Sequence, residues 1–267
     1  HVGAVNALPD PLTTRLLEPL NDDGSFNFVA ALDKGYREGI DPQRNAAMLL
    51  LQILPTPGRI EIRDTLYQQL GIIGPPDGQG FMRPRAFLES LKNPSAGATE
   101  KVDPPAAVKD DDEDEDAPTP EETRFMEQLL VLAKKPWKPA DYPDVAKWLE
   151  LNRQALEDIA LAVDRKRFYV PMVSGRQPEV LPKVSLPYLA PMREAGRALA
   201  ARATLRLADG YIEGSIQDVM TLYRLGRLLR QPPILLCQFT GNALETLAND
   251  TTSTLANHPT LNWGMPA

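Results

Sequence analysis

The chain has 267 residues, of which 43% are apolar and only 6% aromatic, a composition that supplies a core and favours packed helices over an all-β sandwich. The net charge of −7 comes from one run of seven acidic residues at positions 110–116, because the other 29 of the 36 acidic residues balance the 29 lysines and arginines. The net basic footprint typical of a nucleic-acid-binding domain is therefore missing, and the single cysteine, Cys237, excludes an internal disulfide.

The first region, residues 10–93, is predicted to form several short helices separated by turns. Asp10 and Asp41 each precede a proline, which is typical of a capped helix start. Apolar residues lie nearly all round the stretch 46–54, so we expect this helix to be central and buried. Two further short helices are predicted before residue 93.

The second region, residues 94–120, contains the acidic run together with proline, glycine and lysine, and it has few apolar side chains. Such a segment buries too little surface to offset the entropy lost on ordering. It is predicted to be an acidic flexible linker or a long exposed loop.

The third region, residues 121–267, is predicted to consist of helix hairpins. One helix is expected to end before Pro136, and one amphipathic helix is expected over residues 142–165. After a loop or short hairpin, helices are expected on both sides of the turn 209–211 and again after Pro232-Pro233.

The pair of helices around the turn 209–211 has small residues where the two helices would approach closely. The spacing predicts that four larger side chains face inward: Leu199, Leu207, Ile216 and Tyr223. The arrangement resembles a tetratricopeptide-type helix hairpin. The predicted fold class is therefore all-α: an irregular bundle of antiparallel helix hairpins that is partly α-solenoid-like, with a long acidic linker or loop.

Two segments carry a wider resemblance. They are residues 27–51, with Phe28-Val29-Ala30-Ala31-Leu32, Gly39-Ile40-Asp41-Pro42 and Asn45-Ala46-Ala47, and the stretch from Ala200 to Leu229. Together they resemble an uncharacterised family of bacterial extracytoplasmic helical proteins, and the resemblance spans most of the chain. It brings no established activity and no known functional residues. It implies a helical fold and an extracytoplasmic location.

Residue types that support metal, cofactor or nucleophile chemistry are scarce. The chain has only two histidines, His1 and His258, so a zinc site is not expected. An EF-hand-like turn around Gly24 lacks ligands at its first and last positions, Pro19 and Ala30, so no calcium site is expected there. No cofactor motif is present, and Cys237 is interpreted as a small buried apolar residue.

Seven arginines occur on the hairpin helices, several of them three or four residues apart. They are Arg193, Arg197, Arg202, Arg206, Arg224, Arg227 and Arg230. The plain interpretation is that they keep the helices solvated. The functional hypothesis is that some line one face that binds an anionic partner or the chain's own acidic run, through salt-sensitive contacts.

Three hypotheses for function follow. The first is a non-catalytic helical scaffold or protein-binding module, with a protein as its partner. The second is an enzyme of unrecognised type that uses carboxylates in a cleft between two lobes. The third is that the chain is part of a larger protein with a membrane anchor upstream of His1, since no run of about 18 apolar residues exists in the chain itself.

Overall fold

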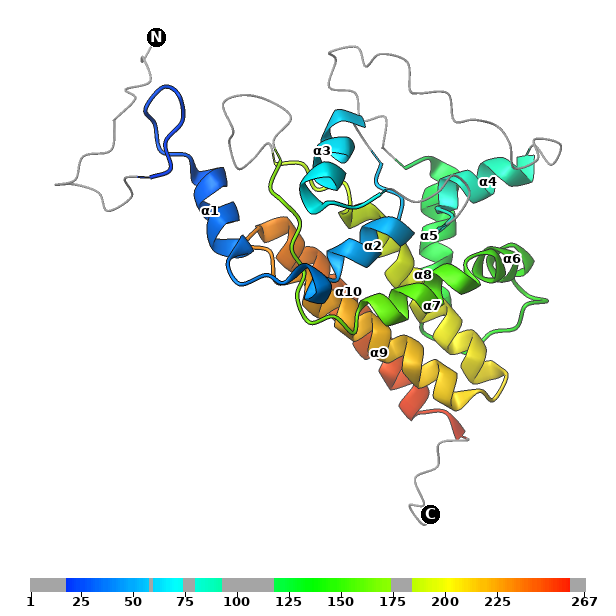
Figure 1. Ribbon diagram of the computed structural model, residues 1–267. Coiled ribbons are helices and arrows are strands. Elements are labelled where there is room, and N and C mark those ends of the chain that lie inside the picture. The colour runs from blue at the N-terminus through cyan, green and yellow to red at the C-terminus, as the bar shows by residue number, and fades with distance from the viewer. Residues whose placement is uncertain (1–17, 58–59, 74–79, 93–117, 174–183, 260–267) are drawn as a thin grey trace, which may run out of the picture.

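The computed structural model describes residues 18–57, 60–73, 80–92, 118–173 and 184–259. Over these ranges the protein is all-α, as predicted: it contains α-helices and isolated β-bridges but no strand (Figure 1). The helices, in chain order, are α1 (Phe28–Arg37), the 3₁₀ helix η1 (Pro42–Arg44), α2 (Ala47–Ile53), α3 (Ile60–Leu70), α4 (Pro84–Lys92), α5 (Pro120–Leu132), α6 (Pro143–Leu151), α7 (Arg153–Ala162), α8 (Leu189–Ala208), α9 (Ile212–Leu229) and α10 (Leu235–Ala256).

The three longest helices, α8, α9 and α10, run up-down-up, and each packs on the other two, so they form a three-helix bundle (Figure 1). The turn between α8 and α9 is the predicted one, and Gly210 adopts a φ of +75°, which glycine accepts without strain. The backbones of α9 and α10 approach closely at Gly226 and Gly241. A Cβ atom at position 241 would lie 2.7 Å from the Gly226 carbonyl oxygen.

The helix α5 packs along α8 and runs in the same direction. The hydroxyl of Thr204 donates to the Leu132 carbonyl at 2.8 Å, and the indole of Trp137 donates to the Ala201 carbonyl at 2.9 Å. The helix α4 in turn packs on α5, and α2 packs on α7. One cluster of buried side chains extends through these helices from Ala46 to Ala248, so it draws on both sides of the acidic segment.

The expected single helix over residues 142–165 is wrong: the structure has α6 and α7 with a break at Asn152. The Asn152 side chain is fully buried and accepts from the Met82 N–H at 2.7 Å. It also donates to the carbonyls of Met82 and Trp148. A local kink thus turns a polar side chain toward a distant backbone segment, while the apolar residues on either side keep their spacing.

The N-terminal helix α1 packs against the extended segment 166–173. The Asn27 side chain caps α1 by accepting from the Ala30 N–H at 2.8 Å. From within α1, Asp33 accepts from the Tyr169 hydroxyl and from the Met172 N–H, and the Tyr36 hydroxyl donates to the Phe168 carbonyl. These contacts hold α1 beside the start of α10 (Figure 1).

The predicted inward face of α9 is wrong at one position. Leu199 and Leu207 of α8 are buried, and Tyr223 is partly buried, but Ile216 is 46% exposed. The buried face of α9 is centred instead on the leucines at positions 222, 225 and 229, because α10 packs on that side. The capped start at Asp41 leads into only one turn of 3₁₀ helix before α2 begins.

Several predictions fall where the structure gives no description. Asp10, His1 and residues 94–117 of the predicted linker lie outside the described residues. The division into regions 10–93, 94–120 and 121–267 therefore stays a prediction.

Candidate functional site

Two of the seven predicted arginines point into the protein. Asp218 on α9 is 1% exposed, and the Arg202 guanidinium on α8 contacts both of its oxygens, at 2.6 and 3.1 Å. Arg206, one turn along α8, adds a contact of 3.0 Å to the same carboxylate. Burial raises the pKa of Asp218, and the two guanidiniums act in the opposite direction. This cluster joins α8 to α9 and is closed to a partner.

Two other arginines form ion pairs nearer the surface. Arg224 contacts Asp164, just after α7, at 2.7 Å, and Arg230 contacts Glu245 of α10 at 3.0 Å. The side chains of Arg193, Arg197 and Arg227 have no hydrogen-bond or ion-pair partner within the described residues. Burial, followed by repulsion from Arg193, lowers the pKa of Arg197. The seven arginines therefore divide among several environments, and the anionic-partner face remains a prediction for the exposed ones.

Buried carboxylates meet at the contact of α4 with α5 and α8, where the enzyme hypothesis would place its acids. The Arg83 guanidinium contacts both oxygens of Glu194, at 2.7 and 2.9 Å, and Arg85 contacts Glu122 at 3.1 Å. Burial raises the pKa of Glu194, and the Arg83 contacts act against this shift. Each acid is thus held by an arginine, an arrangement that joins α4 to its neighbours.

The single cysteine lies on the inner side of α10. Cys237 is fully buried, and its sulfur lies 3.6 Å from the Tyr188 hydroxyl. Burial raises the pKa of the thiol, which keeps it protonated and unreactive at neutral pH. The interpretation of Cys237 as a small buried residue is confirmed.

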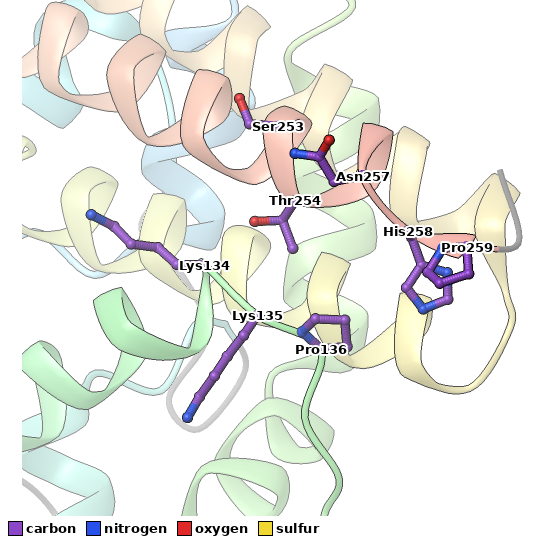
Figure 2. Close-up of a pocket in the computed structure, with 8 residues that line it drawn as sticks. All are labelled: Lys134, Lys135, Pro136, Ser253, Thr254, Asn257, His258 and Pro259. Atoms are coloured by element: carbon purple, nitrogen blue, oxygen red, sulfur yellow. The ribbon is translucent and has the colours of Figure 1, made fainter. Parts of the chain in front are cut away.

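A hollow of about 440 Å³ lies between the ends of α5 and α10. Figure 2 shows that the side chains of Lys134 and Lys135 point away from the hydroxyl and amide groups of α10. Lys134 pairs with Asp250 at 3.3 Å. His258 lines the hollow, but among the described residues no three side chains of the metal-ligating types come together. The charges of this hollow therefore do not converge on one point.

The first turns of α10 carry the most concentrated group of exposed apolar side chains on any one helix. Leu235, Leu236 and Phe239 are 66%, 54% and 59% exposed. Positions i, i+1 and i+4 cover a continuous arc of about 100° on a helix, so the three side chains share one face. We call these three residues the α10 apolar surface.

The α10 apolar surface continues along the helix as an uncharged stripe. Its exposed positions within α10 are Asn242, Ala243, Thr246, Asn249, Thr252, Ser253 and Ala256, and the C-cap residue Asn257 is exposed too. The helix has only two charged residues, and both are paired with other elements, Glu245 with Arg230 and Asp250 with Lys134. Depletion of charge around exposed apolar side chains is typical of the centre of a protein interface.

The sequence did not predict this surface, because residues 234–239 are almost all apolar and such a run is typical of a buried segment. One signal in the sequence could have found it. Cys237 lies about 160° around the helix from Phe239 and 200° from Leu235, so a helix that buries the cysteine turns those two side chains outward. The structure shows that arrangement.

The described residues thus define an all-α protein whose buried ionic groups hold helices together and whose longest helix presents an uncharged face. None of the helices in the described part of the chain combines the length and apolar character needed to cross a membrane. Comparison with protein-family models, with curated protein sequences and with solved structures finds no match to the chain. The resemblance to a bacterial extracytoplasmic family stays a prediction.

Proposed function

We propose that this chain is a non-catalytic helical protein-binding module that docks a partner through the α10 apolar surface. The observation that carries the proposal is the exposure of Leu235, Leu236 and Phe239, each more than half accessible on one face of one helix. Three large apolar side chains left in water cost free energy that docking would recover, at roughly 25 cal/mol per Å² of apolar surface covered.

The alternative, an enzyme that uses carboxylates, draws less support from the same structure. The buried acids Glu122, Glu194 and Asp218 each contact at least one arginine at 3.1 Å or less. A general acid or base needs an open position within hydrogen-bond reach of a substrate. Holding these carboxylates with guanidiniums fits a structural role for them.

The proposal is tested with a neutral amphipathic probe peptide, an 18-residue helix with leucines at i, i+3, i+4 and i+7 and glutamines elsewhere. We expect fluorescence anisotropy to show binding to the full chain. Leu236→Ser combined with Phe239→Ser should weaken that binding by about tenfold or more, because the anchoring side chains are lost. Leu161→Ser is the matched control, since Leu161 is a comparably exposed leucine, 69% accessible, on a different helix, α7.

Circular dichroism establishes that each variant is folded. Equal binding by the wild type and the Leu236→Ser/Phe239→Ser variant, or no binding of the probe at millimolar protein, would overturn the proposal. A second copy of this chain is the other possible occupant of the surface, and sedimentation of the chain alone tests for it by measuring the oligomeric state. A dimer that the double variant abolishes would show that the surface pairs two copies of this chain.

A further inference from the structure

We infer that the partner presents an acidic amphipathic helix to the α10 apolar surface; the inference rests on the proposed function. The observation behind it is a group of basic residues from two other segments beside the first turns of α10. We call Lys166, Arg167, Arg227 and Arg230 the basic rim. All four are exposed.

Hydrogen bonds fix the position of the basic rim relative to α10. The Gln231 side chain, just before α10, donates to the Lys166 carbonyl at 2.9 Å and accepts from the Phe168 N–H at 2.9 Å. It thereby holds residues 166–168 beside the start of the helix.

The C-terminal end of α9 is fixed in the same way. The Gln238 side chain donates to the carbonyls of Arg230 and Pro232. Gln238 lies about 60° around α10 from Leu235, so the end of α9 borders the edge of the α10 apolar surface. Arg227 lies one turn before Arg230 on the exposed side of α9.

The charge of the basic rim is largely uncompensated. Arg230 pairs with Glu245, whereas the side chains of Lys166, Arg167 and Arg227 have no ion-pair partner among the described residues. The first turn of α10 adds positive charge beside this surface. No side chain caps the turn, and the start of a helix carries a partial positive charge. An acidic segment would complement both features.

The pattern of α10 favours a protein helix over a lipid surface as the occupant. Helices that lie on membranes combine a broad apolar face with lysines and arginines along the polar face. The helix α10 contains neither lysine nor arginine, and its exposed face continues as asparagine, threonine, serine and alanine. A partner helix with a short apolar stripe and acidic flanks fits this combination.

The test uses three versions of one probe peptide, with identical leucine stripes and with glutamine, glutamate or lysine on the flanks. At about 50 mM salt we expect the glutamate peptide to bind the full chain about tenfold more tightly than the lysine peptide. Raising the salt to about 500 mM should remove most of that difference and leave the affinity of the glutamine peptide nearly unchanged.

A second arm uses the variant Lys166→Glu/Arg167→Glu/Arg227→Glu, which leaves the Arg230–Glu245 pair intact. The preference for the glutamate peptide should disappear or reverse, while the glutamine peptide binds as before. Arg63→Glu, on α3, serves as a single charge-reversal control away from the basic rim's own residues and should change neither affinity.

The outcomes separate the two proposals. If the glutamine peptide binds through Leu236 and Phe239 but glutamate and lysine flanks bind equally, the acidic partner is wrong and the docking function stands. If the glutamine peptide does not bind, both proposals fail. Preferential binding to vesicles of phosphatidylcholine and phosphatidylserine, lost in both variants, would show a membrane surface in place of a protein and overturn the inference.

Discussion

The Asn152 side chain pairs with both backbone groups of Met82, accepting from its N–H at 2.7 Å and donating to its carbonyl at 3.1 Å. Asn45 does the same for Tyr169, accepting from its N–H at 2.9 Å and donating to its carbonyl at 2.8 Å. Each asparagine is buried, and its side-chain amide makes the two backbone hydrogen bonds that a neighbouring strand would make to an extended segment. In this way two connections are held in the core without forming a sheet.

Replacing Asn152 with leucine should lower the free energy of unfolding by about 1–3 kcal/mol, because the Met82 N–H would lose its acceptor inside the protein. The Met82 carbonyl would keep its second donor, the Trp148 indole, at 2.9 Å. Urea unfolding followed by circular dichroism measures this change. Asn242→Ala, at an exposed position of α10 with no side-chain hydrogen bond, is the control and should stay within about 0.5 kcal/mol of the wild type. A similarly small loss for Asn152→Leu would contradict the role given to this side chain.

Asp218→Asn should destabilise the protein by about 3–5 kcal/mol, because it leaves the buried Arg202 guanidinium without its counterion. Asp164→Asn removes the carboxylate of a surface pair with Arg224 and should cost at most about 1 kcal/mol. Urea midpoints of the two variants provide the comparison. Equal losses would mean that burial does not distinguish the two ion pairs.

The raised pKa of Glu194 gives a pH dependence with a definite sign. Between the ordinary carboxyl pKa and the raised one, the folded protein binds more protons at this site than the unfolded chain does. The stability contributed by Glu194 is therefore greatest below the unfolded pKa and declines as the pH rises through the folded pKa.

The comparison with Glu194→Gln isolates this effect. The stability difference, wild type minus variant, should grow in favour of the wild type as the pH falls from about 7 to about 4.5. Unfolding free energies at several pH values measure it. A difference that shrinks on acidification would show that pairing with Arg83 outweighs burial and lowers the pKa.

Gly241→Ala should destabilise the protein by about 1–2 kcal/mol, although alanine normally favours a helix. The new methyl group would lie 2.7 Å from the Gly226 carbonyl oxygen, so the backbones of α9 and α10 must separate. Gly35→Ala in α1 is the matched control, because nothing lies within 4 Å of its Cβ position. It should raise the thermal midpoint slightly; a similar rise for Gly241→Ala would argue against close packing there.

The sequence predicts the helices well because their signals are local. Prolines and glycines end the elements, and apolar spacing sets the buried faces, as at Gly210 and along α8. The break at Asn152 leaves no such signal, because α6 and α7 keep apolar side chains at helical spacing. Only the distant backbone of Met82 explains why the chain kinks there.

The candidate site is harder to predict because it depends on the packing between helices. Arg202 and Arg227 look equivalent in the sequence, yet one faces a carboxylate of α9 and the other faces solvent. Likewise, Leu235 resembles a core residue until Cys237 fixes which side of α10 is buried. In both cases the way in which neighbouring helices pack decides which side chains are buried. The sequence of a single helix does not specify that packing.

Hydrogen–deuterium exchange of the full chain, with and without the glutamate-flanked probe peptide, tests most directly whether α10 is where a partner docks. We predict that bound peptide slows amide exchange in the first turns of α10 and at residues 166–168, and that this protection is lost in the Leu236→Ser/Phe239→Ser variant. Protection confined to residues elsewhere, such as those that line the hollow beside Lys135 and Asn257, would contradict docking at the start of α10.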